Sequence, residues 1–404
     1  MKNLSVHEAR RLMLEKAQRL GSERVELAAA HGRVLAKSVI ANRDQPPFFA
    51  AAMDGYAVRR SDLSPTGAVL LVIGESAAGG GFDRPVAAGQ CVRIFTGAPL
   101  PRDCDLVIVQ ESVRREGNLA RMPADIGTSR HIRPQGGDYL QGTVLLTPGE
   151  RLDAWRLSLA ASAGAAVLDV ARRPRVAVLS TGDELVEPGQ VPQPNQIYNS
   201  GSHAICALVE TWGAQALRLH CAADKIEDIT AAVSGLYVDL ILTLGGASVG
   251  DHDLVKPAMV ILGLDLMVQT IAIRPGKPTW FGTLQDGRRV LGLPGNPASA
   301  LVCAQLFLRP LIQAMLGQQP GPDIETAHLA SALPALGTSG GPREHWSRAD
   351  LETRQGQLWV RPFRDQDSSL VTVFAEARAL MRQEANGEGL DQGAIVEIVR
   401  LDRL

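Results

Sequence analysis

The chain has 404 residues, of which 45% are hydrophobic and 21% charged. This length exceeds what one hydrophobic core usually supports, and it predicts roughly two to four domains. Because 41 basic residues face 43 acidic ones, no charge surplus exists to hold nucleic acid or a membrane surface, and any polyanion binding must be local.

The first twenty residues, MKNLSVHEARRLMLEKAQRL, predict an amphipathic helix rather than a signal peptide, since charges interrupt every apolar run. Ser5 and Glu8 have the spacing of a capping box. Unbroken apolar stretches long enough to span a bilayer are not expected in this sequence, which favours a soluble protein. The scattered cysteines, without a Cys-x-x-Cys pair, favour a reducing, cytoplasmic setting; they are Cys91, Cys104, Cys206, Cys221 and Cys303.

Residues 1–45 and 139–172 flank a block, 46–138, that is punctuated by glycine and proline and is mostly β in pattern. Short apolar runs at 68–74 and 105–111 predict strands within this block. The pattern indicates a discontinuous, helix-containing linker domain, 1–45 with 139–172, that is interrupted by an inserted β domain.

From residue 173 onward, strand and helix patterns alternate. Apolar runs at 175–180, 216–221, 240–244 and 290–294 predict strands, and helices are expected after residue 199, from Asp224, after Asp253 and over 296–316. For the last helix, Asn296 is expected at the N-cap and Pro297 at the first position. This alternation predicts a doubly wound α/β domain over 173–318. After the linker 317–323, the tail to residue 404 predicts a small β barrel or sandwich.

Three strand-end loops of the α/β domain share small residues, hydroxyls and exposed N–H groups: 180–189, 245–253 and 293–299. Such loops beside helix starts are typical of cradles for phosphate or another anion. A single loop of this kind is more often a plain turn. Three loops at one sheet edge favour a ligand site.

Acidic residues accompany these loops, and they are Asp183, Glu184, Asp224, Asp251 and Asp253. Carboxylates beside a bound anion repel it unless a cation lies between them, and Mg²⁺ is the simplest candidate. Helix caps or solvated turns remain an alternative for Asp224 and Asp251.

Basic residues follow at 273–282, where Arg274 and Lys277 flank a Pro-Gly turn. Solvated loop charges are one interpretation, and a clamp for a small oxyanion is the other. In the inserted block, Asp54 and Thr96 each precede a glycine and fit plain turns. Arg133 and Asp138 have no local explanation.

An ordered set of motifs joins these pieces: AMDGYAV, RIFTGAPLP, GGD, LSTGDEL, QIYNS, LTLGGASVGDHD, IRPGKP and LPGNPASA. The set resembles the molybdopterin molybdenumtransferases, the MoeA and gephyrin E-domain family. The match runs in order from about residue 5 to residue 316 and continues more faintly to the end. Each motif alone is weak, whereas the ordered series is highly specific.

The resemblance implies an elongated, four-domain homodimer whose active cleft lies between the α/β domain of one subunit and the inserted domain of the other. It implies insertion of molybdenum from molybdate into adenylylated molybdopterin, with release of AMP and with Mg²⁺ as cofactor. An adenylyltransferase that supplies the substrate and apo-molybdoenzymes that receive the product are implied partners. The resemblance implies neither nucleic acid nor a membrane as a partner.

The resemblance also carries roles over to matching positions. It implies catalytic roles for Asp54, Thr96, Glu184, Asp224 and Asp253, the last three of which would also hold the metal ion. It implies substrate contacts for Ser180, Thr181, Gly182, Asp183, Gly245, Gly246, Ser248, Gly250, Pro294, Gly295, Asn296 and Ser299. It implies oxyanion contacts for Arg133, Arg274, Lys277, Arg343 and Ser368.

Four positions depart from the family's pattern. Arg274 stands where lysine is common, Thr270 where a second basic residue is frequent, Gly201 where asparagine is usual, and Asp367 where glycine is usual. These departures concern the affinity for the oxyanion and the choice between molybdate and tungstate.

Two other functions compete with this prediction. A molybdopterin adenylyltransferase resembles residues 173–316 alone, so the inserted block argues against it. A non-enzymatic dimeric scaffold would need no acid cluster, so Glu184, Asp224 and Asp253 argue against that alternative.

Overall fold

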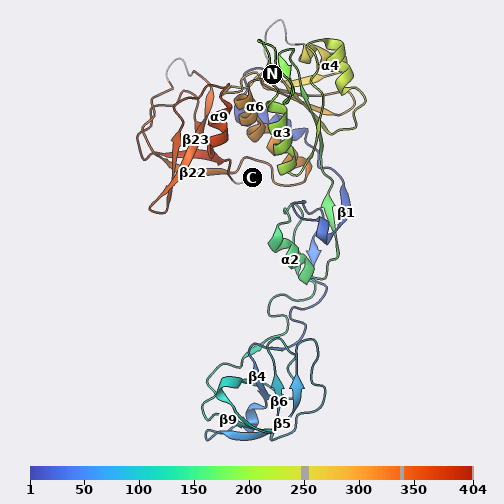
Figure 1. The fold of residues 1–404 in the computed structure, drawn as a ribbon, viewed down its shortest axis with the longest axis vertical. Helices are drawn as coiled ribbons and strands as arrows, with labels where there is room; N and C mark the ends of the chain where they lie inside the picture. Colours follow the sequence, from blue (N-terminus) through green and yellow to red (C-terminus); the bar gives the residue numbers. More distant parts are fainter. Residues whose placement is uncertain (247–253, 337–340, 403–404) are drawn as a thin grey trace.

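The structure is a computed structural model that describes residues 1–246, 254–336 and 341–402. The molecule is elongated, with the α/β domain and the C-terminal barrel side by side at one end and the inserted domain at the other (Figure 1). The linker domain lies between them. The chain runs through it twice, once toward the inserted domain and once on the return. The predicted multidomain fold is confirmed.

The two passes through the linker domain are joined by short antiparallel pairs. Strand β1 (Ser22–Glu26) pairs with β12 (Val167–Ala171), and β2 (Val39–Ile40) pairs with β11 (Val144–Leu146). Helix α2 (Ala154–Ser162) begins at Asp153, whose carboxylate accepts the Arg156 N–H. Buried aliphatic side chains, among them Leu35, Leu152 and Val170, form a separate core here.

Helix α1 (Val6–Glu15) has Ser5 as its N-cap, as predicted, but only the Ser5 half of the capping box forms. The Glu8 N–H donates to Ser5 Oγ at 3.2 Å, and the Ser5 hydroxyl bonds to a Glu8 carboxylate oxygen at the same distance. The apolar face of α1, including Leu12 and Met13, packs into the core of the α/β domain. The sequence grouped this helix with the linker domain, because helical periodicity shows that a face is buried but not what covers it.

The inserted domain is built on a six-stranded sheet in the order β7-β4-β6-β5-β9-β8. Its strands are β4 (Gly55–Val58), β5 (Ala68–Ser76), β6 (Gln90–Ile94), β7 (Leu106–Val109), β8 (Arg114–Glu116) and β9 (Leu119–Met122). A short pair, β3 (Ala50–Ala51) with β10 (Ile132–Arg133), lies beside it. Strands β5 and β7 confirm the strands that the apolar runs at 68–74 and 105–111 predicted.

The α/β domain has a six-stranded sheet in the order β16-β13-β17-β21-β20-β18, in which the first four strands are parallel and β20 is antiparallel to both of its neighbours, β21 and β18. These strands are β13 (Arg175–Ser180), β16 (Gln215–Arg218), β17 (Leu240–Leu244), β18 (Asp265–Val268), β20 (Trp280–Thr283) and β21 (Arg289–Leu293). Helices α3 (Gly201–Thr211), α6 (Pro297–Cys303) and α7 (Arg309–Met315) cover one face. Helices α4 (Ile226–Val233) and α5 (Val255–Ile261) cover the other.

Helices α6 and α7 continue into one another through a π-helical turn, η4 (Ala304–Leu308). In the described part of the chain, this Pro297–Met315 segment is the one helix long and apolar enough to cross a membrane, with a mean hydropathy of 1.4. Unbroken apolar stretches do not reveal a run of this length in the sequence, because this helix includes Gln305 and Arg309. However, 78% of the segment is buried inside the protein, as expected for a core helix.

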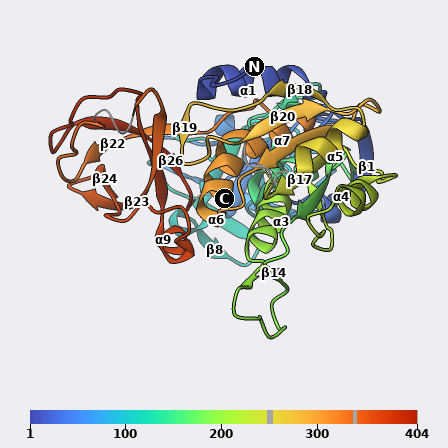
Figure 2. The same cartoon turned by 90° about the horizontal axis from the view of Figure 1, so that it is seen from above.

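The C-terminal domain is a closed barrel, which decides between the two predicted architectures. Its strands close in the order β23-β24-β22-β26-β25, with β25 returning to β23. They are β22 (Ile324–Leu329), β23 (Glu344–Arg354), β24 (Gln357–Pro362), β25 (Ala379–Gln383) and β26 (Ile395–Arg400), and α9 (Val371–Glu376) lies between β24 and β25. From above, the barrel lies beside the α/β domain, and the arm that carries β14 (Leu185–Val186) projects away from it (Figure 2).

One strand joins the two domains directly. Strand β19 (Ile273–Arg274) belongs to the α/β segment of the chain but pairs in parallel with β23 of the barrel. In this pairing Ile273 lies opposite Glu344 and Arg274 opposite His345. The backbone hydrogen bonds of this strand fix the barrel to the edge of the α/β domain.

Candidate functional site

Three neighbouring parallel strands end at the same edge of the α/β sheet. Ser180 ends β13, Leu244 ends β17 and Leu293 ends β21. The loops that follow are tied together, because the Thr181 N–H donates to the Leu244 carbonyl at 3.1 Å and the Gly245 N–H to the Leu293 carbonyl at 3.3 Å. Strand order reverses between β13 and β17, and open α/β sheets bind ligands at such a reversal.

A cavity of about 730 Å³ opens at this edge, and we name it the switch-point cavity. Ten of the residues named from the sequence line it: Ser180, Thr181, Gly182, Glu184, Asp224, Gly245, Gly246, Pro294, Gly295 and Asn296. The three predicted loops therefore meet in one hollow. Asp183 lies at its margin, where its carboxylate accepts the Asp224 N–H at 3.3 Å. The positions of Ser248, Gly250, Asp251 and Asp253 lie outside the described residues.

Glycine is required at the start of the loop after β17. Gly245 has a φ of +96°, and a Cβ there would lie 2.8 Å from the Thr181 carbonyl oxygen. Any side chain would be strained and would separate the two loops. The glycine lets the backbones of adjacent loops approach closely beneath the cavity.

The predicted acids gather around one side of this cavity. Burial, together with the negative charges around it, raises the pKa of the nearby Cys221 thiol to about 11; the charges are those of Glu187, Glu184, Asp224 and Asp183. Glu187 is engaged elsewhere, since its carboxylate accepts from Arg218 at 2.8 Å and from Asn199 at 3.3 Å. Glu184 and Asp224 line the cavity itself.

Two carboxylates facing the loops of an anion site match the oxygen ligands that Mg²⁺ prefers. The donor set therefore fits a hard divalent ion, as far as the described residues extend. Within those residues no group of three or more His, Cys, Asp or Glu side chains is placed to hold a metal. The third predicted ligand, Asp253, lies outside them, so the complete set stays a prediction.

A second hollow of about 510 Å³ lies between the α/β domain and the barrel, and we name it the basic cavity. Four of the predicted oxyanion residues line it together with Ser299: Arg274, Lys277, Arg343 and Ser368. Strand β19 explains this assembly, because pairing with β23 sets Arg274 next to His345, two residues beyond Arg343. Three cationic side chains around one small hollow can hold an oxyanion through charge-assisted hydrogen bonds.

The two cavities adjoin. Pro278 lines both of them, and Ser369 lines the switch-point cavity while Ser368 lines the basic cavity. Between them, Asn296 Nδ2 donates to Ser368 Oγ at 2.9 Å. Asn296 occupies the predicted N-cap position of α6, but its side chain makes no capping hydrogen bond.

Two departures from the family's pattern have structural outcomes. Asp367 lines the basic cavity, and its carboxylate accepts both the hydroxyl and the N–H of Ser369, which lowers its pKa. It therefore adds a negative charge to a basic hollow. Thr270 does not line that cavity, and its hydroxyl instead accepts the Asn3 N–H at 2.8 Å.

Asp54 and Thr96 lie in the inserted domain, far from both cavities. Asp54 directly precedes β4, at the opposite end of the molecule from α4 and Asp224 (Figure 1). Thr96 donates its N–H and its hydroxyl to one oxygen of Asp54, and these two hydrogen bonds hold the pKa of Asp54 below its ordinary value. The two residues, which come from separate sequence motifs, form one hydrogen-bonded unit.

Arg133 is also in the inserted domain, where it lines a hollow of about 700 Å³ with Arg43, Gly97 and Asp138. Within one chain it therefore lies apart from Arg274 and Lys277, and its predicted oxyanion contact stays a prediction. The spacing of charged residues along the sequence does not show which of them lie together in space. Arg133 lies beside the loop of Thr96, since Gly97 lines the same hollow.

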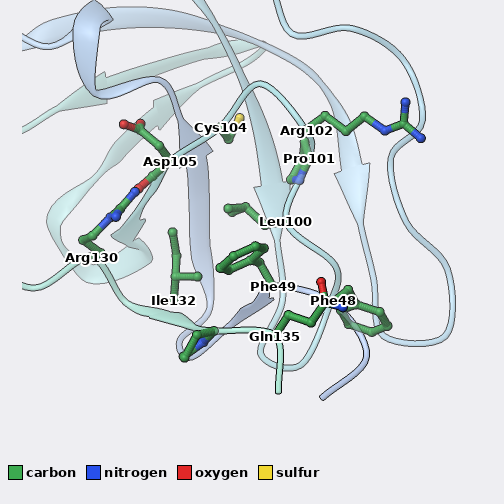
Figure 3. Close-up of a pocket in the computed structure, with 11 residues that line it drawn as sticks. Phe48, Phe49, Leu100, Pro101, Arg102, Cys104, Asp105, Arg130, Ile132 and Gln135 are labelled. Carbon is green, nitrogen blue, oxygen red and sulfur yellow. The ribbon is translucent and has the colours of Figure 1, made fainter. Parts of the chain in front are cut away.

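A further hollow of about 630 Å³ in the inserted domain is lined mainly by apolar side chains, with Phe49 and Leu100 near its centre (Figure 3). Two of the polar residues that line it, Asp105 and Arg130, are held by hydrogen bonds within the inserted domain. Arg130 donates to the Asp105 carbonyl at 3.0 Å, and the Asp105 carboxylate accepts the Arg60 N–H at 2.7 Å. The residues that line it include none of those named for the site.

Sequence reasoning missed Asn199. This buried residue lines the switch-point cavity, where its Oδ1 accepts the Ser180 hydroxyl at 3.2 Å and its Nδ2 donates to Glu187. The signal was the QIYNS motif itself, which precedes α3 at the same sheet edge. Tyr198, from the same motif, also lines the cavity.

Comparison with known families gives matches along almost the entire chain. The MoeA N-terminal region (domain I and II) matches residues 4–164. The probable molybdopterin binding domain matches residues 177–314. The MoeA C-terminal region (domain IV) matches residues 333–401.

Individual relatives agree with these matches. The molybdopterin molybdenumtransferase of Haemophilus influenzae is 33% identical over 411 residues, which cover 99% of each chain. That of a Nostoc species is 37% identical over 310 residues, which cover 74% of this chain and 71% of the relative. The crystal structure of the molybdopterin biosynthesis protein MoeA from Pyrococcus horikoshii superimposes with a TM-score of 0.84, at 30% identity and 99% coverage of both chains.

Proposed function

The chain belongs to the MoeA family of transferases, the molybdopterin molybdenumtransferases, and we propose that it transfers molybdenum from molybdate to adenylylated molybdopterin with release of AMP. One observation carries the proposal: a large hollow at the strand-order reversal adjoins a smaller basic hollow, and the hydrogen bond from Asn296 to Ser368 lies between them. A phosphate-bearing organic substrate suits the first, and a small oxyanion suits the second.

The proposed reaction balances without an oxidant or reductant. Two Mo–S bonds form between molybdate and the dithiolene sulfurs, and one oxygen leaves with the two thiol protons as water. Cleavage of the phosphoanhydride consumes one water and releases AMP, leaving the phosphate on the pterin. Molybdenum keeps its oxidation state throughout.

In this proposal the residues divide by cavity. The loops that begin at Ser180, Gly245 and Pro294 hold the pterin phosphates through backbone N–H groups and hydroxyls. Arg274, Lys277, Arg343 and Ser368 hold molybdate. Glu184 and Asp224, with Asp253 as the third ligand, would bind Mg²⁺, which supplies positive charge against the phosphates when bound.

Asp54 and Thr96 require a second copy of the chain in this proposal. They lie at the opposite end of the molecule from the cavities (Figure 1), so they reach a site only as part of a homodimer in which each cleft uses both subunits. We place the reaction in the cytoplasm, with an adenylyltransferase that supplies the substrate and apo-molybdoenzymes that receive the product.

The test supplies the purified protein with adenylylated molybdopterin, Mg²⁺ and molybdate, and follows AMP release with and without the oxyanion. AMP release that depends on molybdate, together with molybdenum bound to the pterin, is the expected result. AMP release that ignores molybdate would overturn the proposal. Formation of adenylylated molybdopterin from ATP and molybdopterin would instead favour the adenylyltransferase alternative.

A further inference from the structure

The residue that begins helix α6 makes its side-chain contact with another domain. Asn296 makes no capping hydrogen bond to its own helix, and its Nδ2 donates to Ser368 Oγ at 2.9 Å. The barrel loop supplies the helix with an acceptor instead, because the Ala298 N–H donates to the Ser368 carbonyl at 3.2 Å. Ser368 is thus bound to the start of α6 through both its side chain and its backbone.

This contact determines what the Ser368 hydroxyl can do. A hydroxyl group has one proton to donate and lone pairs that accept. Since the amide of Asn296 occupies an accepting position, the Ser368 proton remains available for donation. Ser368 lines the basic cavity with Arg274 and Lys277, so a donor directed into that cavity meets the oxyanion.

The loop that carries Ser368 is fixed from behind. Arg348 is 1% exposed, and its guanidinium donates to the Asp367 carbonyl at 2.9 Å and to the Leu370 carbonyl at 3.0 Å. The Gln366 side chain accepts the Arg348 N–H at 3.0 Å and donates to the Arg348 carbonyl at 2.9 Å. These hydrogen bonds hold the backbone on both sides of Ser368. The direction in which its hydroxyl donates is then set by the hydrogen bond from Asn296.

We propose that Asn296 is a positioning residue, which orients the Ser368 hydroxyl toward the oxyanion in the basic cavity. Asn296 also lines the switch-point cavity, so one amide serves the cavity of the organic substrate and, through Ser368, the cavity of the oxyanion. This inference rests on the proposed function, in which the basic cavity holds molybdate. It changes the role of Asn296 from the direct substrate contact that the sequence predicted.

A double-mutant cycle on molybdate binding tests the inference, since it isolates the part of the effect that passes through Ser368. The full chain, without nucleotide, is titrated calorimetrically with molybdate as wild type, Asn296→Ala, Ser368→Ala and the double variant. Each single change is expected to weaken binding by about three- to tenfold, the scale of one hydrogen bond. The double variant is expected to bind no more weakly than Ser368→Ala alone.

Two further variants separate positioning from folding. Asn296→Ser keeps a residue that favours the N-cap position but is too short to reach Ser368, so it should lose as much affinity as Asn296→Ala. Gln313→Ala removes a comparable amide contact, to the Gly321 N–H at 3.1 Å, near the same domain junction, and should leave the affinity for molybdate unchanged. Thermal unfolding is recorded for every variant.

Additive losses in the double variant, or an unchanged affinity in Asn296→Ala, would overturn the positioning role. Normal affinity in Asn296→Ser would also overturn it. If the wild-type chain binds no molybdate at all, the proposed function fails as well, and that outcome is distinct from binding with additive losses.

Discussion

Thr96 donates two hydrogen bonds to one carboxylate oxygen of Asp54, through its N–H at 2.8 Å and its hydroxyl at 2.7 Å. This pairing fixes the carboxylate, which is partly exposed to solvent, in the bend before β4 and favours its ionised form. Because both donors prefer the charged form, the pKa of Asp54 lies below its ordinary value of 3.8. Asp54 can therefore present a fixed negative charge, rather than a titrating acid, to whatever faces it.

Replacing Thr96 with valine is expected to raise the pKa of Asp54 toward its ordinary value, because the hydroxyl bond is lost while the N–H bond stays. A folded-state pKa below the unfolded one contributes stability that is full above the unfolded pKa and is lost as pH falls through the folded pKa. The variant should thus lose this contribution at a higher pH than the wild type. Titration of the Asp54 carboxyl carbon by NMR measures the shift, and an unchanged pKa would show that the hydroxyl bond is unimportant.

Asp54 and Glu184 are at opposite ends of one chain, so a shared cleft should allow complementation between subunits. Asp54→Ala and Glu184→Ala are each expected to be inactive in AMP release. When the two are unfolded, mixed and refolded together, random pairing in a symmetric dimer would restore about a quarter of wild-type activity, since half the dimers hold one intact cleft. A mixture as inactive as its components would exclude clefts built from two chains.

The fold followed closely from the periodicity of the sequence where neighbours along the chain decide the structure. The run Leu240–Leu244, apolar except for Thr243, became a central parallel strand, and Ser5 capped α1 by accepting the Glu8 N–H, as its spacing predicted. The strand-end loops met in one cavity because parallel strands end at the same sheet edge. These features depend on local pattern and on one topological rule.

Features that depend on contacts between domains could not be predicted from the sequence. Nothing in the pattern of α1 shows that it packs on the α/β domain rather than on the linker domain. The side chain of Asn296 fits an N-cap by spacing, yet a barrel residue some seventy positions later, Ser368, takes its hydrogen bond. Such choices among partners are made by tertiary packing, which residue spacing does not encode.

A side chain at position 292 is expected to destabilise the α/β domain strongly. Gly292 lies opposite Trp280 in the central sheet, and a Cβ there would approach the Trp280 Nε1 to 2.0 Å. Trp280 is fully buried and cannot move aside. Gly292→Ala is therefore expected to destabilise the α/β domain by about 1–3 kcal/mol, the usual effect of overpacking, as measured by urea unfolding. Gly21→Ala, where a Cβ has open space around it, is the matched control, and equal stability of the two variants would contradict the prediction.

Removing the negative charge of Asp367 is expected to raise the affinity for molybdate. The Asp367 carboxylate, ionised because Ser369 lowers its pKa, lines the basic cavity and repels an oxyanion there. Asp367→Asn keeps an oxygen that can accept the Ser369 N–H and removes the charge, so the affinity for molybdate should rise about two- to fivefold, as for other exposed charge pairs. The gain should shrink as salt is added. Asp365→Asn neutralises a neighbouring acid that does not line the cavity, and it should change the affinity less. A weaker or unchanged affinity in Asp367→Asn would contradict this role.

The acids of the switch-point cavity predict a dependence on divalent ions. Glu184 and Asp224 line the hollow, so Glu184→Gln and Asp224→Asn should each weaken binding of a Mn²⁺ probe by about ten- to a hundredfold, the effect of losing a charged ligand. Chelation should stop AMP release, and added Mg²⁺ should restore it. Glu187→Gln serves as the control, because that carboxylate is held by Arg218 and Asn199 and does not line the cavity. Mn²⁺ affinity is measured by electron paramagnetic resonance. If the control loses as much affinity as the two cavity variants, the ion does not bind at the predicted carboxylates.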